Sequence, residues 1–210
     1  MKKSNTLPRP SKGEISELPA FEGLPIDRIH LVRSQSEVEF ATRKLTEARF
    51  IGFDTETKPT FTKEAVRSGP HVIQFATLEH AFIVQVGAPG LLGFLKDVIE
   101  STVMVKVGFG LKSDRAPLSS QLKIHLRASV DLSHTIRNLG YSQAVGVKAA
   151  VAIILGRKLA KPKSMTTSNW AKPELRPNQL MYAANDAHAA LAVFNAMGRP
   201  YAPEPSSGVL

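Results

Sequence analysis

The chain has 210 residues and contains no cysteine, one tryptophan and three tyrosines. Without cysteine it cannot form disulfides, thiolate zinc sites or iron–sulfur clusters, and it has no cysteine nucleophile. It also lacks an apolar run near the ~20 residues that a membrane span needs. No apolar stretch follows the basic amino end, as a secretory signal would require. We therefore expect a cytoplasmic (intracellular) protein with no membrane partner.

Acidic residues are also scarce relative to basic ones. The chain has 18 Asp and Glu residues and 27 Lys and Arg residues, which gives a net charge of +9. A basic surface attracts polyanions, most often nucleic acid. Solubility alone is the alternative explanation of this charge. The charge therefore indicates a class of partner but does not indicate a reaction.

Proline and glycine concentrate toward the two ends of the chain. Residues 1–26 contain four prolines among Lys, Ser and Gly and show no strand or helix period, which predicts a flexible basic arm. Residues 199–210 contain three more prolines and predict a short tail. Because a domain takes roughly 100–200 residues, residues 27–198 are expected to form one.

Between these ends, short apolar runs alternate with segments of helical period. The expected strands lie at 29–32, 50–57, 71–77, 81–86, 103–109 and 129–132, with the third and fourth forming a hairpin. The expected helices lie at 38–48, 91–99, from about 111, at 147–155, and from 177 to just before 198. This order predicts an α/β fold with a mixed β-sheet flanked by α-helices.

The strand at 50–57 carries two acids spaced by one residue, Asp54 and Glu56. Side chains alternate across a strand, so both carboxylates project from one face. Neighbouring carboxylates repel each other and raise each other's pKa, and a divalent cation would relieve that repulsion. For this pair taken alone, a solvated strand end is the alternative interpretation.

Three further residues extend the set. Asp114 follows a buried strand in a glycine-bearing turn, where α/β sheets place their sites. Tyr182 and Asp186 are four residues apart and share one face of an alanine-rich helix. Small residues let that helix lie close to the sheet, which would bring Asp186 toward Asp54. Hard oxygen ligands of this kind suit Mg²⁺ or Mn²⁺ and do not suit zinc.

Taken in order, these residues resemble a known family. A D-x-E pair on a strand, an acid in V-G-F-G-x-x-x-D and a terminal Y-x-x-x-D are similar to the DEDDy 3′–5′ exonucleases. The resemblance is to the branch that includes ribonuclease D and the exonuclease domain of the Werner helicase. It covers roughly residues 28–197 and includes the Ser-Asn-Trp triplet at 168–170.

The resemblance implies a ribonuclease H-like fold and a metal-dependent exonuclease that releases nucleoside 5′-monophosphates from a free 3′ end of DNA or RNA. It implies two divalent ions, Mg²⁺ or Mn²⁺. Asp54, Glu56 and Asp186 would hold one ion, and Asp54 with Asp114 through water would hold the second. Tyr182 would orient the attacking water, since a phenol with a pKa near 10 is mostly neutral.

Five residues are candidates for substrate binding: Thr55, Thr57, Lys163, Asn169 and Trp170. The two threonines could reach the terminal nucleotide. Basic residues around the triplet, Lys163 among them, could contact phosphates, and a solvated basic loop is the alternative. Trp170 could stack on a base, and packing beneath a loop is the alternative.

Two positions depart from the family pattern. His188 stands where an aromatic residue is common, and Pro117 follows Asp114 closely, so a helix there should begin near or after Asp114 or be bent. Two other functions stay open: a non-catalytic nucleic-acid-binding module on the same fold, and a structural or adaptor domain. The choice between DNA and RNA is open too, as are strand preference, physiological metal, oligomeric state and protein partners.

Overall fold

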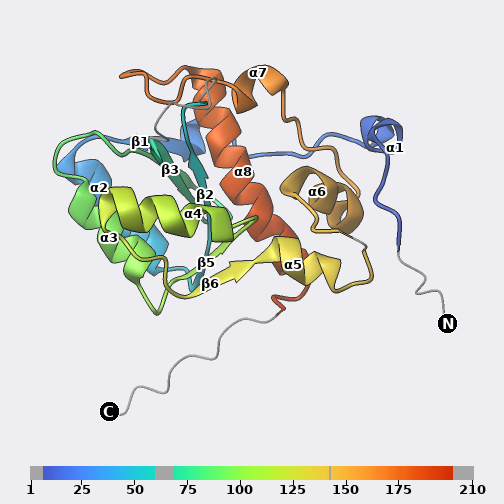
Figure 1. Cartoon of the computed structure of the whole chain (residues 1–210). Coiled ribbons are helices and arrows are strands. Elements are labelled where there is room, and N and C mark those ends of the chain that lie inside the picture. The colour runs from blue at the N-terminus through green and yellow to red at the C-terminus, as the bar shows by residue number, and fades with distance from the viewer. Residues whose placement is uncertain (1–6, 60–68, 142, 201–210) are drawn as a thin grey trace, which may run out of the picture.

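A computed structural model describes residues 7–59, 69–141 and 143–200 of the chain (Figure 1). In this part of the chain six strands form one sheet in the order β1-β4-β3-β2-β5-β6. The strands are β1 Ile29–Val32, β2 Phe50–Glu56, β3 Val72–Ala76, β4 Ala81–Gln85, β5 Val105–Gly108 and β6 Ser129–Asp131. β2 pairs antiparallel with β3 and β3 with β4, whereas the other three pairings are parallel. The predicted mixed sheet and the β3–β4 hairpin are confirmed.

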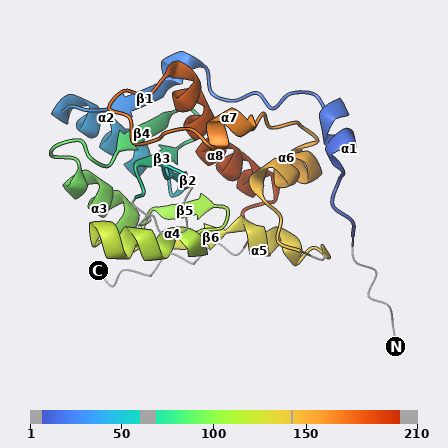
Figure 2. The same cartoon turned by 45° about the horizontal axis from the view of Figure 1, so that its top comes forward.

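Helices cover both faces of this sheet (Figures 1 and 2). The helices of the described residues are α1 Lys12–Glu17, α2 Gln35–Thr46, α3 Leu92–Glu100, α4 Lys112–Pro117, α5 Leu132–Arg137, α6 Val147–Leu155, α7 Lys163–Thr166 and α8 Pro177–Ala196. A 3₁₀ turn, η1, spans Ile26–Arg28, and a π-helical turn, η2, spans Leu118–Leu122. Both views show α8 beside α6, with α2 and α3 on the other side of the sheet. In the part of the chain described, no helix is long and apolar enough to cross a membrane.

The two faces of β2 belong to different parts of the core. Ile51 and Phe53 are 0% exposed and pack with residues of α2 and α3. Gly52 faces α8, where a Cβ atom built on it would lie 2.0 Å from the carbonyl oxygen of Ala187. Only glycine permits this approach. The predicted close contact of the alanine-rich helix with the sheet is therefore observed, and it brings Asp186 to the edge of β2.

Local signals account for several element ends. α2 begins at Ser34 with a capping box to Glu37, in which each side chain accepts a bond from the other residue's backbone N–H. α6 ends at Gly156, whose φ of 61° lies in the left-handed region. The end of α6 lies where the sequence pattern predicts it, whereas α2 begins three residues before the expected start at 38.

The chain around Asp114 agrees with the sequence expectation. α4 begins at Lys112, one residue from the expected start at about 111 and near Asp114. Beyond Pro117 the helix continues as the π turn η2. Proline has no N–H to donate to the preceding turn, and this loss explains the change in helix type.

The stretch predicted as a flexible basic arm, residues 1–26, contains the helix α1, which the sequence analysis did not predict. Ile15 is 6% exposed, and the backbone N–H groups of Leu7 and Phe21 donate to the carbonyls of Gly140 and Lys158. The described part of the arm therefore packs against the domain. The domain boundaries at 27 and 198 stay predictions, and most of the predicted tail lies outside the described residues.

Candidate active site

Three carboxylates converge where β2 ends against α8. Ligand oxygens of Asp54, Glu56 and Asp186 all lie within 4.8 Å of one another, with Asp186 buried and the other two partly buried. Alternation along β2 turns Asp54 and Glu56 toward α8, because Phe53 packs on the opposite face. The strand and the helix that were expected to carry the acids, β2 and α8, thus lie side by side as predicted.

An ammonium group that the sequence analysis did not place in this cluster lies within it. Nζ of Lys161 is 2.6 Å from Oδ2 of Asp186 and 5.2 Å from the centre of the Tyr182 ring. The Lys161 side chain is 24% exposed. Lys161 lies in an irregular loop before α7, where no periodicity tells which way a side chain points. Its position could have been suspected only from the excess of acids that need a cation.

Burial and mutual repulsion raise the pKa values of the carboxylates in this cluster. Burial raises the pKa of Asp54 well above its ordinary value, and the charges of Asp186 and Asp114 add to the rise. Burial raises the pKa of Glu56 to about 9, with the charge of Asp54 contributing. Burial alone would lower the pKa of Lys161, but Asp186 and Asp54 outweigh burial and raise it. One ammonium is set against three carboxylates. Hard oxygen donors with this excess of negative charge fit a divalent cation.

Asp114 approaches the cluster from the other side of β2. The hydroxyl of Thr55 donates a bond of 2.6 Å to Oδ1 of Asp114. Burial raises the pKa of Asp114 to about 6, although the Thr55 bond acts in the opposite direction. Asp114 is outside the group of three, yet its charge reaches Asp54. In this structure Thr55 holds a carboxylate, and its contact with a terminal nucleotide stays a prediction.

Tyr182 lies one helical turn before Asp186 on α8. Its hydroxyl is 3.5 Å from Oγ1 of Thr166 on α7. Burial raises the pKa of Tyr182, and the nearby charge of Asp186 adds to the effect. The phenol is therefore neutral near pH 7 and suited to orienting a water molecule by hydrogen bonding.

The remaining predicted substrate contacts are placed differently from one another. Trp170 is 0% exposed and packs 5.9 Å from the Tyr182 ring, so stacking on a base is wrong and packing beneath the loop is observed. Thr57 is exposed and lines a cavity of 710 Å³ together with Thr55 and Asp114. Lys163 and Asn169 are exposed too. Neither lines that cavity or the 230 Å³ cavity at Asp54 and Asp186, as far as the described residues define them.

Comparison with known proteins matches this architecture. Residues 29–200 match the family model of 3′–5′ exonucleases. The bifunctional 3′–5′ exonuclease/ATP-dependent helicase WRN of Mus musculus is 29% identical over 167 residues, which are 76% of this chain and 12% of that protein. The Nibbler EXO domain of Aedes aegypti superposes with a TM-score of 0.71 at 26% identity, covering 84% of this chain and 89% of that one.

A second solved structure supports the fold alone. Escherichia coli RNase D is 18% identical, with a TM-score of 0.69. The matched region covers 81% of this chain and 44% of the RNase D chain. The expected ribonuclease H-like architecture is thereby confirmed. Since the family model spans most of the described residues, the chain belongs to the 3′–5′ exonuclease family.

Proposed function

We propose that this chain is an active, metal-dependent 3′–5′ exonuclease of the DEDDy type, which hydrolyses phosphodiester bonds at the 3′ ends of nucleic acids and releases nucleoside 5′-monophosphates. The observation that carries the proposal is the convergence of Asp54, Glu56 and Asp186 within 4.8 Å. A protein that only bound nucleic acid would gain nothing from such repulsion among its acids.

Each side chain of the site has a separate role in the proposed reaction. Asp54, Glu56 and Asp186 would hold one Mg²⁺ or Mn²⁺ ion, and Asp54 with Asp114 a second. When bound, such ions supply an activated water and neutralise charge on the leaving oxygen. Thr55 keeps Asp114 in place through its 2.6 Å bond. The neutral hydroxyl of Tyr182 orients the water.

Two features support nucleic acid as the substrate. The net charge of +9 favours a polyanion. The curated relative WRN and the Nibbler EXO domain are named for exonuclease activity. This chain spans only 12% of WRN, so the activity and substrate are proposed here for the domain itself.

The test is digestion of matched DNA and RNA oligonucleotides labelled at either end, with Mg²⁺, Mn²⁺ or a chelator. We expect metal-dependent shortening from the 3′ end. Asp54→Asn and Asp186→Asn should each lower kcat about 1,000-fold or more, because metal-assisted stabilisation is worth several kcal/mol. Asp54→Asn should leave the melting temperature unchanged or raised, because it removes one of several repelling charges, whereas Asp186→Asn should lower it, because it breaks the buried ion pair with Lys161. Asp97→Asn, an exposed acid on α3, is the control.

Tyr182→Phe tests the role of the phenol separately. It keeps the ring packed on Trp170 and removes only the hydroxyl, so we expect a loss of about 100-fold in kcat with unchanged substrate affinity. Full activity of the Asp54→Asn protein would refute the site. Salt-sensitive binding without cleavage under any condition would indicate a non-catalytic binding module instead.

A further inference from the structure

The strand β3 carries one buried polar side chain, Gln74. It is 0% exposed, and neither Oε1 nor Nε2 has a hydrogen-bond partner within the described residues. Burying an amide without partners destabilises the folded chain, and an apolar side chain of the same size would avoid that loss. Such a group in a native core needs an explanation, and a polar site beside it is one.

The strand register places Gln74 directly opposite Asp54. The two residues are paired in the antiparallel β2–β3 ladder, as Phe53 and Phe75 are on the other face. Directly opposite residues of such a ladder project from the same face, with Cβ atoms about 4.5–5.5 Å apart. Asp54 turns toward α8, so Gln74 turns toward α8 as well. A glutamine side chain is long enough to reach the Asp54 carboxylate from that position.

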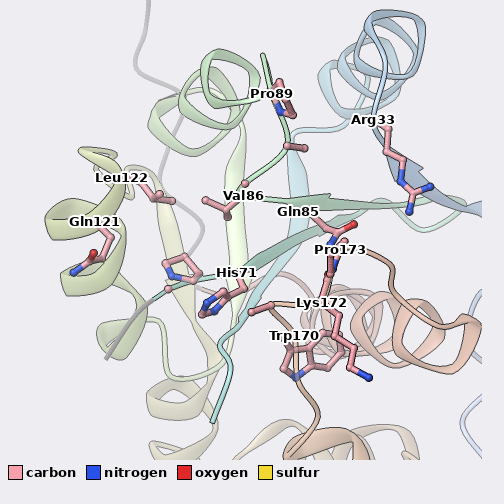
Figure 3. A pocket seen from close by; sticks show the side chains of 15 residues that line it. Arg33, His71, Gln85, Val86, Pro89, Gln121, Leu122, Trp170, Lys172 and Pro173 are labelled. Atoms are coloured by element: carbon pink, nitrogen blue, oxygen red, sulfur yellow. The ribbon is translucent and has the colours of Figure 1, made fainter. Parts of the chain in front are cut away.

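The other strand positions around Gln74 offer its amide little. Its neighbours along this face of β3 and its partner on β4 are apolar and pack with alanines of α8: Val72, Ala76 and Ile83. Gln85 lies one diagonal step away on β4, and its Nε2 donates a bond of 2.8 Å to the carbonyl oxygen of Lys172 (Figure 3). On β2, by contrast, Asp54 lies directly opposite and Glu56 one diagonal step away. The acids are therefore the natural partners of this amide.

An amide donor suits a carboxylate that also holds a metal ion. Hydrogen bonds to a ligating carboxylate fix its orientation toward the ion. Two other acids of the site have such a partner, since Thr55 donates to Asp114 and Nζ of Lys161 lies 2.6 Å from Asp186. An amide is neutral, so it can support a carboxylate without the positive charge with which an ammonium group would repel the ion.

We propose that Gln74 is a positioning residue for Asp54, with Nε2 donating a hydrogen bond to the Asp54 oxygen that does not bind the metal ion. The bond holds the carboxylate in the orientation that the ion needs and gives the buried amide its partner. The inference rests on the proposed function, because it concerns the metal site formed by Asp54, Glu56 and Asp186. Gln74 then acts on metal affinity and not on folding.

The test is Gln74→Met in the full chain, because methionine has a similar length and no N–H donor. Calorimetric titration should show Mn²⁺ binding weakened about tenfold or more, the usual loss when a group that supports a metal ligand is removed. Thermal unfolding in chelator should give a melting temperature equal to or above that of the wild type, because an unpaired buried amide has been removed. A side chain that only packs would give the opposite pair of results, a lower melting temperature and an unchanged affinity.

Ile73→Met is the matched control. Ile73 is the adjacent residue of β3, is 0% exposed and packs on the opposite face of the sheet. This variant should keep the Mn²⁺ affinity of the wild type. NMR of the wild-type chain gives a second readout that depends on no substitution: the side-chain amide protons of Gln74 should shift downfield when Mg²⁺ is added, because they gain a charged acceptor.

Three results would overturn the inference: an unchanged Mn²⁺ affinity in Gln74→Met, an equal loss in Ile73→Met, or Gln74 amide protons that do not move with Mg²⁺. These results differ from a failure of the proposed function. A wild-type chain that binds neither Mn²⁺ nor Mg²⁺ refutes the metal site and both proposals with it. A chain that binds metal and digests no substrate refutes the proposed function alone, while the Mn²⁺ affinity of Gln74→Met still decides the role of Gln74.

Discussion

Replacing Lys161 with methionine tests whether its ammonium stands where a metal ion would bind. Nζ of Lys161 lies 2.6 Å from Oδ2 of Asp186, among carboxylates that fit a divalent cation. Methionine has similar length and no charge. If ammonium and metal compete for the same oxygens, the substitution destabilises the metal-free protein and strengthens metal binding.

The magnitude follows from burial. Breaking a buried ion pair costs about 3–5 kcal/mol, because the remaining charge is left without a partner. Since 24% of the Lys161 side chain stays in water, the lower end of about 3 kcal/mol applies. In a protein of this size 1 kcal/mol corresponds to about 2–4 °C, so the melting temperature should fall by about 6–12 °C in chelator.

The assay is thermal unfolding in chelator and across a Mn²⁺ titration, with calorimetric titration of Mn²⁺ as a second readout. Mn²⁺ should restore most of the lost stability, and the variant should bind Mn²⁺ at least about tenfold more tightly, a difference of 1.4 kcal/mol. Lys163→Met, an exposed residue on α7, is the control. Equal Mn²⁺ affinity and an equal thermal shift in variant and wild type would refute the competition.

Two other substitutions test how the fold supports the site. Gly52→Ala should lower the free energy of unfolding by about 1–3 kcal/mol and lower exonuclease activity. Its Cβ would lie 2.0 Å from the carbonyl oxygen of Ala187 and push α8 away from β2. Denaturation and activity assays measure the two effects, and Gly93→Ala, in open space, is the control for both. Burial, followed by neighbouring positive charge, lowers the pKa of His80, so the unfolded chain binds more protons below the ordinary histidine pKa. The contribution of His80 to stability should therefore fall from pH 7 to pH 5, opposite to the contribution of the buried carboxylates, whose pKa values are raised. His80→Gln should remove that contribution, which urea titrations at both pH values measure as a difference from the wild type; His125→Gln, at an exposed position, is the control.

Periodicity in the sequence predicts the elements that carry the chemistry. Alternation fixes the side of β2 on which Asp54 and Glu56 lie, and the i, i+4 spacing fixes that of Tyr182 and Asp186 on α8. The abundance of alanine predicts close contact between these two elements. These are local properties, and they are confirmed because strands and helices present their faces at fixed intervals.

The irregular segments could not be predicted in the same way. Trp170 is buried and Lys161 points into the carboxylates, although both lie in the loops around α7 where no repeat constrains direction. A cavity of 730 Å³ (Figure 3) has walls from five separate segments, which are residue 33 and residues 69–71, 85–89, 121–122 and 170–173, so no single stretch of sequence predicts it. Such features depend on tertiary packing, which decides where loop side chains go after the sheet and helices are in place.

The register of β2 explains how one short strand carries Asp54 and Glu56 and also contacts both Asp186 and Asp114. Its even positions, Asp54 and Glu56, face α8 and Asp186, whereas Thr55 faces the other way and bonds to Asp114. A slip of one residue would exchange these faces and bury two carboxylates in the apolar core beside α3. The buried Phe53 prevents that slip, since it would then lose its place in the core. The same alternation that folds the sheet thus brings acids from both of its sides to one edge.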